Sequence, residues 1–121
     1  MKPSKKQVFY DDLVFQVYED VYEPAEDTFL AADHMVVNED DIVLDMGTGC
    51  GIIAILAAKK AKKVVAVDIS PHAVRCIRKN VEINKLVDKI DIRKGDLFKP
   101  ISKSEKFNLI IFNAPYLPST L

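Results

Sequence analysis

The 121-residue sequence lacks the features that mark several classes of protein. No apolar run approaches the roughly 20 residues that a membrane-spanning helix needs. The start, MKPSKKQVFYDD, has neither the apolar segment nor the small-residue cleavage site of a secretion signal. The only two cysteines, Cys50 and Cys76, form neither a disulfide framework nor a metal-ligand cluster. We therefore expect a reduced, cytoplasmic setting without a membrane or a metal.

Neither sign of charge is in excess, because 17 Lys and Arg face 18 Asp and Glu and the net charge is -1. Such a balance gives no strongly basic field, so nucleic acid is not the expected partner. No repeat, low-complexity stretch or linker divides the chain. One domain over residues 1–121 is predicted, with a hairpin and a helix over 1–38 and a core of βαβ units over 39–121.

The first third of the chain is the least regular part. Residues 8–10 and 13–17 are apolar enough to form a short hairpin around the polar Asp11-Asp12 turn. A helix is expected to follow, because Glu23-Pro24 and the next acidic residues are typical of a helix start. That helix is expected to continue to Val37 and to end at the polar run 38–41.

Apolar runs and amphipathic segments alternate over the rest of the chain. Strands are expected at residues 42–44, 64–67, 89–92 and 107–112, and helices at 52–60 and from Ser70 onward. Ser70 is a suitable N-cap and Pro71 suits the first helical position. Apolar strands alternating with helices indicate an α/β fold with a parallel, doubly wound, Rossmann-like sheet.

A glycine-rich turn follows the first of these strands, with the sequence Asp45-Met46-Gly47-Thr48-Gly49-Cys50-Gly51. The glycines are spaced G-x-G-x-G, so Ile52 stands where a dinucleotide site has its third glycine, and no Lys-Ser/Thr pair follows as in a P-loop. An acid before the first glycine would repel a pyrophosphate. The turn therefore predicts a ligand with an adenosine-like ribose and no phosphates.

Two further acids come at the ends of the next two strands. Asp68 is placed to accept hydrogen bonds from both ribose hydroxyls, and Asp96 from the amino group of adenine. Leu97 and Phe98 offer apolar contact to the base, and the helix start after Gly51 would face a carboxylate. These features together predict S-adenosylmethionine as the ligand.

With these motifs in this order, residues 42–116 resemble the class I methyltransferases, which use S-adenosylmethionine and release S-adenosylhomocysteine. Asn113-Ala114-Pro115-Tyr116 looks like the N-P-P-Y loop of members that methylate planar nitrogen, with Ala114 in place of the first proline. The Asn113 side-chain oxygen and the Ala114 carbonyl would each accept an N–H of the acceptor. Tyr116 would stack on the acceptor, and Pro115 would keep Ala114 extended.

Residues 21–30, VYEPAEDTFL, resemble the segment before the glycine turn in HemK-related enzymes of the archaeal and eukaryotic type. That subfamily methylates the glutamine of the Gly-Gly-Gln motif in peptide-chain release factors, and its members work with a small zinc-binding activator protein. The resemblance implies that Thr28 contacts the methionine end of the cofactor and Asp45 its amino group. It also implies that the remaining cofactor contacts come from Gly47, Gly49, Gly51, Asp68, Asp96, Leu97 and Asn113.

Two other functions stay open at this point: methylation of an amino group in nucleic acid, such as adenine N6, and cofactor binding without catalysis. The class I fold has seven strands, and this chain supplies four, so the C-terminal strands are expected to be missing. The strand that contains Leu109, Ile110, Ile111 and Phe112 would then stand at an open apolar edge. Such an edge predicts association between copies of the chain.

Overall fold

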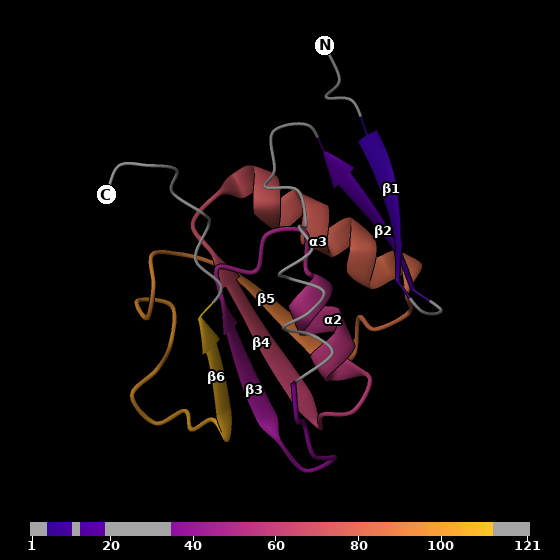
Figure 1. The fold of residues 1–121 in the computed structure, drawn as a ribbon. Coiled ribbons are helices and arrows are strands. Elements are labelled where there is room, and N and C mark those ends of the chain that lie inside the picture. The colour runs from indigo at the N-terminus through magenta and orange to yellow at the C-terminus, as the bar shows by residue number, and fades with distance from the viewer. Residues whose placement is uncertain (1–4, 11–12, 19–34, 113–121) are drawn as a thin grey trace, which may run out of the picture.

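The computed structural model describes residues 5–10, 13–18 and 35–112 (Figure 1). Its centre is a four-stranded sheet in the order β5-β4-β3-β6, in which every neighbouring pair is parallel. The strands are β3 (Ile42–Met46), β4 (Lys63–Asp68), β5 (Ile90–Lys94) and β6 (Leu109–Phe112). The predicted Rossmann-like α/β fold is confirmed, and the expected strands lie within a few residues of the observed ones.

Two helices, α2 (Ile52–Ala58) and α3 (Pro71–Ile83), cover one face of this sheet. Alternate strand residues point to each face, so Val43, Val64 and Ala66 pack under the helices. Leu44, Met46, Val65 and Val67 point to the opposite face, where Ile101 and Phe107 of the loop after β5 pack against them. Burial on both faces explains why the strands are continuously apolar.

The sheet register places the carboxyl ends of the four parallel strands together at one end of the sheet, which is called the carboxyl edge below. Met46 pairs with Val67 on one side and with Phe112 on the other, and Asp68 pairs with Lys94. At the opposite edge, β6 is fastened to β3 because the Ile42 backbone N–H donates to Asn108 Oδ1 at 2.8 Å. The segments that follow β3, β4 and β5 therefore meet at the carboxyl edge.

The start of α3 is as predicted. Pro71 occupies the first turn, and the Ser70 side chain accepts a hydrogen bond from the Ala73 backbone N–H at 3.3 Å. Helix α2 ends two residues earlier than predicted, at Ala58. The chain turns there because Ala61 is buried and the Lys62 backbone N–H donates to the Asp41 carbonyl at 2.9 Å, which leads it into β4.

The predicted N-terminal hairpin is also present, as antiparallel strands β1 (Lys5–Tyr10) and β2 (Leu13–Tyr18), with Tyr10 paired with Leu13. Strand β2 lies against α3 (Figure 1). Of the predicted helix 23–37, only residues 35–37 lie within the described residues.

These last residues of the predicted helix, Met35 to Val37, are not helical, so the expected end at Val37 is wrong. Val37 is buried in the core cluster that also contains residues of α2 and α3, whereas Val36 is exposed. The next residues form a turn in which the Asn38 backbone N–H donates to Asp41 Oδ2 at 2.9 Å. Core burial of Val37 and this turn favour an extended entry into β3. Among the described residues, no helix has the length and apolarity needed to cross a membrane.

Candidate functional site

The glycine turn after β3 crosses the carboxyl end of β4. The backbone N–H groups of Gly47 and Thr48 both donate to the Val67 carbonyl, at 2.8 and 3.2 Å. Gly47, Gly49 and Gly51 all have positive φ, of 77°, 59° and 91°. Left-handed backbone of this kind strains residues with a Cβ, which explains the three glycines.

Gly51 is required for a second reason, its contact with α3. A Cβ at Gly51 would lie 2.6 Å from Cγ1 of Ile77, whereas one at Gly49 would meet nothing within 4 Å. The turn and α3 thus pack in direct contact at Gly51. Gly49 leaves open space at the surface of the turn, where a ligand can approach the backbone closely.

Asp45 lies under this turn and is fully buried. Its Oδ2 atom accepts a hydrogen bond from Thr48 Oγ1 at 2.9 Å, and its Oδ1 atom has no hydrogen-bond partner among the described residues. The pKa of Asp45 is raised to about 7, mainly because the carboxyl group is buried; the Thr48 hydroxyl opposes the shift and the nearby Asp68 carboxylate contributes to it. A carboxyl group with one oxygen that no described residue pairs therefore lies at the base of the turn.

Asp68 ends β4 and links three segments of the carboxyl edge. Its Oδ2 accepts the Gly49 backbone N–H at 3.0 Å, and its Oδ1 accepts the Ser70 backbone N–H at 2.9 Å. The Asp68 carbonyl accepts the Gly95 N–H at 3.0 Å. Each carboxylate oxygen has a second lone pair, so Asp68 can still accept hydroxyl donors from a ligand.

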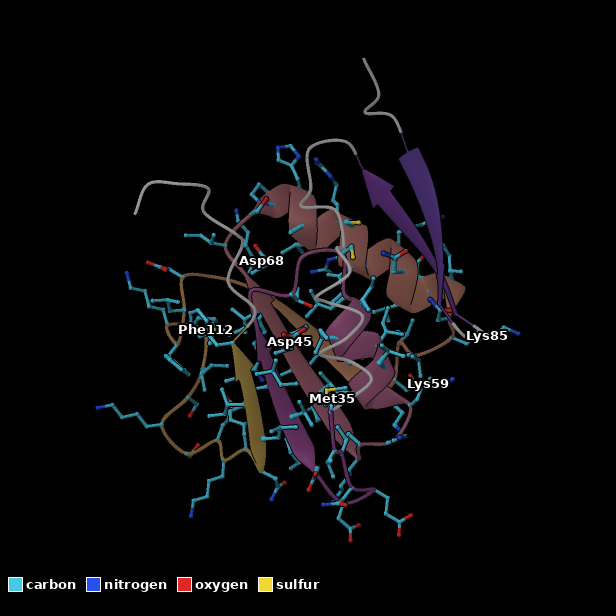
Figure 2. The ribbon with its side chains drawn as sticks, viewed as in Figure 1. Met35, Asp45, Lys59, Asp68, Lys85 and Phe112 are labelled. Atoms are coloured by element: carbon cyan, nitrogen blue, oxygen red, sulfur yellow. The ribbon has the colours of Figure 1, made fainter. Side chains whose placement is uncertain are left out.

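A cleft of about 220 Å³ opens beside Asp68 at the carboxyl edge. Figure 2 shows Asp68 and Phe112 near this end of the sheet. The lining residues come from the ends of β3, β4 and β6 and from the loops that follow β3, β4 and β5: Met46, Gly47, Val67, Asp68, Ile69, Gly95, Asp96, Leu97 and Phe112. An apolar cleft with carboxylates at its rim suits a flat base joined to a sugar.

Three large apolar side chains of this cleft are more than half exposed: Ile69 at 62 %, Leu97 at 51 % and Phe112 at 58 %. Leu97 also has a left-handed backbone, with φ 53°. Asp96 is exposed, and its Oδ2 atom lies 4.0 Å from Nζ of Lys99. Exposed apolar groups beside carboxylates are typical of a binding site, since a bound base would cover them.

Ile69 and Phe112 were not predicted as ligand contacts, although both line the cleft. Their positions in the sequence could have indicated this role, because each residue is at the end of a predicted strand or directly after one. Asn80 of α3 was also missed. It is fully buried, and its Nδ2 donates to the Cys50 carbonyl at 2.8 Å, so it fixes the glycine turn from below.

The structure brings together Asp45, Gly47, Gly49, Gly51, Asp68, Asp96 and Leu97 from the predicted set. Thr28, Asn113, Pro115 and Tyr116 lie outside the described residues, so their predicted contacts remain predictions. Burial raises the pKa of Cys50 to about 12, as befits a buried packing residue. No group of metal-binding side chains occurs among the residues that the structure describes.

A salt bridge holds the loop between β5 and β6, which carries Asp96 and Leu97. The Arg93 guanidinium contacts both oxygens of Glu105, at 2.8 and 2.7 Å, and donates to the Pro100 carbonyl at 3.0 Å. This pairing lowers the pKa of Glu105 to about 2 and raises that of Arg93. The bidentate geometry fixes the side of the cleft formed by the loop.

Relatives of the chain carry names of glutamine methyltransferases. A Methanocaldococcus jannaschii protein named "Putative protein N5-glutamine methyltransferase" is 40% identical over 111 residues, which are 91% of this chain and 54% of that protein. A release factor glutamine methyltransferase of Aliivibrio fischeri is 39% identical over 90 residues, 73% of this chain and 31% of that enzyme. The chain thus spans about half of the first relative and less of the second.

Solved structures with the same fold carry names of tRNA enzymes. The crystal structure of the Methanocaldococcus jannaschii tRNA m1G37 methyltransferase has a TM-score of 0.83 and 30% identity, over 96% of this chain and 37% of that one. The structure of Trm5 from the same organism in complex with adenosine has a TM-score of 0.80 and 30% identity, over 96% and 36%. These similarities confirm the class I methyltransferase fold.

The sequence model of one family matches residues 22–120, most of the chain. It describes the TRM5/TYW2 methyltransferase domain, whereas the sequence had suggested the HemK-related subfamily, which stays a prediction. The match covers the glycine turn, the strand-end acids and the tetrapeptide after β6. The chain belongs to the TRM5/TYW2 methyltransferase domain family of class I methyltransferases.

Proposed function

We propose that this chain is the cofactor-binding core of an S-adenosylmethionine-dependent N-methyltransferase, whose acceptor is the side-chain amide of the glutamine in a release-factor Gly-Gly-Gln motif. The main support for this cofactor is the cleft at the carboxyl ends of the strands, with Asp68 at its rim and the glycine turn beside it. The adenosine bound to the similar Trm5 supports the same ligand type.

The cleft fits the adenosine part of this cofactor. Asp68 keeps a lone pair on each oxygen for the two ribose hydroxyls. The base would lie between Ile69, Leu97 and Phe112, with Asp96 near its amino group. Asp45 would face the amino group of the methionine part. When bound, the cofactor supplies an electrophilic methyl group on its sulfonium.

The acceptor site is proposed to lie at residues 113–116, directly after β6. An amide nitrogen is a weak nucleophile, so catalysis depends on orienting it in line with the methyl group. Asn113 and the Ala114 carbonyl would accept its N–H groups, and Tyr116 would stack on its plane. The relatives named as glutamine methyltransferases support this acceptor.

A base in tRNA is the second candidate acceptor, and the similarity to the tRNA m1G37 methyltransferase favours it. The charge distribution along the chain also favours it. Residues 7–58 contain no Lys or Arg, so most of the basic residues fall in 59–112, although the total charge is balanced. Charge asymmetry between the halves of a chain suggests an interaction with nucleic acid or with a membrane surface.

Methyl transfer from labelled S-adenosylmethionine separates the two acceptors. The natural full-length protein is incubated with a release factor, with the same factor carrying Gln→Ala in Gly-Gly-Gln, and with unmodified tRNA. Label in the unaltered factor alone supports the proposal. Label in tRNA alone overturns the glutamine assignment and supports the second candidate. In either case Asn113→Ala should abolish transfer, whereas Glu82→Gln, at an exposed position of α3, should retain it.

A further inference from the structure

A run of lysines, Lys59-Lys60-Ala61-Lys62-Lys63, joins α2 to β4 at the end of the sheet opposite the cleft beside Asp68. The loop between α3 and β5 lies next to this run, because the Lys89 carbonyl accepts the Val64 backbone N–H at 2.9 Å. Segments 59–63 and 82–89 together contain six lysines and two acids, so their net charge is +4 in a chain whose total is -1. The balanced total thus hides a local concentration of positive charge.

A pocket of about 400 Å³ lies between the end of α2 and the loop after α3. Three lysines and three apolar residues are among those that line it: Lys59, Lys85, Lys89, Ala58, Ile83 and Leu86. Figure 2 shows Lys59 and Lys85 well away from Asp68 and Phe112. The pocket is therefore separate from the cleft at the carboxyl edge, with which it shares no lining residue.

The backbone that carries these lysines is held in place. Ala58 and Ala61 flank the first two lysines of the run, and both alanines are buried in the core. Lys85 has a left-handed backbone, with φ 59°. The other non-glycine residue with positive φ in the described part of the chain is Leu97, which lines the cleft beside Asp68. Strained backbone of this kind clusters at ligand-binding sites.

The end of α3 does not need the Lys85 ammonium group. The Val81 carbonyl accepts the Leu86 backbone N–H at 3.0 Å, and the Glu82 carbonyl accepts the Lys85 backbone N–H at 3.1 Å. Backbone donors thus satisfy these two carbonyls. Among the residues that the structure describes, neither Lys85 nor Lys89 forms an ion pair. Their ammonium groups can therefore bind an anion from outside the chain.

We propose that this pocket binds the backbone phosphates of a nucleic acid, with Lys85 and Lys89 as contacts and the run 59–63 beside them. Lysine binds phosphate as a point charge, and a row of phosphates matches several lysines gathered on one surface. Carboxylates of an acidic protein are better matched by the planar fork of arginine, and the pocket is lined by lysines. A membrane surface is too broad to enter a pocket between two helix ends.

This inference goes beyond the proposed function, because it does not depend on which acceptor is methylated. Strand β4 runs from Lys63 beside the pocket to Asp68 at the cleft, and its six residues span roughly 20 Å. A nucleic acid bound at the pocket can therefore hold the protein without filling the cleft. S-adenosylhomocysteine and a short RNA should bind at the same time, without competition.

Fluorescence anisotropy with a labelled single-stranded oligoribonucleotide tests the site at a series of salt concentrations. Each phosphate contact contributes about 0.7 to the slope of log affinity against log salt concentration, so Lys85→Gly with Lys89→Gln should lower the slope by about 1.4 and the affinity about tenfold. Lys103→Gln with Lys106→Gln is the matched control. It removes the same charge from exposed positions between β5 and β6 and should bind RNA nearly as wild type does.

The single exchange Lys85→Gly separates RNA binding from stability. Glycine is the residue best suited to left-handed backbone at a helix end, so this variant should keep or raise the midpoint of urea unfolding. Its affinity for RNA should fall, while its affinity for S-adenosylhomocysteine should not change. Loss of stability with unchanged RNA binding would mean that Lys85 has only a structural role, and would overturn the site.

Competitors identify the partner. Polyglutamate and vesicles of anionic phospholipid should displace the RNA far less well than unlabelled RNA does. Equally strong displacement by polyglutamate would indicate an acidic protein as the partner, and binding of vesicles in place of RNA would indicate a membrane. Either result overturns the proposal, as does an equal loss of RNA affinity in the Lys103→Gln, Lys106→Gln control.

Discussion

The carboxylate of Asp68, at the end of β4, accepts the backbone N–H of Gly49 in the turn after β3 at 3.0 Å. This bond joins the ends of two neighbouring strands before any ligand binds. The same carboxylate also accepts the Ser70 N–H at 2.9 Å, at the start of α3. Asp68 is therefore held in place from both sides, which spares the site the entropy of ordering it on binding.

Replacing Asp68 with Asn should weaken binding of S-adenosylhomocysteine more than it weakens the fold. The Asn side chain keeps one acceptor and loses the charge, and hydrogen bonds to charged groups contribute about 1.5–3 kcal/mol. We expect affinity to fall about 10- to 100-fold, measured by equilibrium dialysis. A ligand lacking both ribose hydroxyls is the control: it should bind wild type and Asp68→Asn equally, and an equal loss for both ligands would contradict the ribose contact.

Two glycines of the same turn should respond differently to alanine. Gly51→Ala forces a Cβ to 2.6 Å from Ile77 Cγ1 at φ 91°, so we expect several kcal/mol of destabilisation in urea unfolding. Gly49→Ala meets open space and should cost only the left-handed strain, about 1 kcal/mol. Ile77→Ala, which removes the Cγ1 and Cδ1 atoms that the new Cβ would meet, should destabilise the protein less in the Gly51→Ala background than in wild type. Equal losses in the two single variants would show that the Ile77 contact does not matter.

Much of this arrangement could be predicted from the sequence, because it follows local rules. Continuous apolar runs indicated the parallel strands, Ser70-Pro71 indicated the start of α3, and parallel strand ends place Asp45 and Asp68 at one edge. That Oδ1 of Asp45 has no hydrogen-bond partner among the described residues could not be foreseen, since it depends on which groups pack around it. Residues 35–37 were misread because helical periodicity gave no sign that Val37 enters the core.

Hydrogen bonds and ion pairs between residues far apart in the sequence could not be predicted either. Asn80 looks like a polar residue on a helix, yet it is fully buried and bonded to a carbonyl 30 residues earlier. Arg93 pairs with Glu105 across a loop whose path no periodicity defines. Such contacts arise only after the strands and helices have packed, so neither propensity nor spacing encodes them.

Asp45 predicts an unusual dependence of stability on pH. Its pKa is raised from 3.8 to about 7, so its neutral form favours folding below the ordinary aspartate pKa, and this contribution is lost as pH rises toward 7. The free energy of unfolding of the ligand-free protein should therefore fall by up to about 4 kcal/mol relative to Asp45→Asn between pH 4 and 7. Urea unfolding of both proteins across this range checks it. A difference that does not change with pH would contradict a buried neutral acid.

The edge strand β6 should promote self-association. Ile110 and Phe112 are 52 % and 58 % exposed, on the last strand of the described sheet. An exposed apolar edge pairs readily with another strand, and a lysine there opposes pairing. We expect this chain to sediment as a dimer or larger species and Ile110→Lys to shift it toward monomer. Val36→Lys, an exposed apolar residue away from β6, is the control, and a monomeric wild-type chain would contradict the prediction.

The most direct test of the whole account is calorimetric titration of this chain with S-adenosylhomocysteine, with folding confirmed by circular dichroism in the same samples. We expect saturable binding of one ligand per chain, abolished in Asp68→Ala and retained in Glu82→Gln, because the cleft beside Asp68 forms from strand ends and loops of this chain. A folded chain that shows no saturable heat at millimolar ligand, or an Asp68→Ala variant that binds as wild type does, would contradict it.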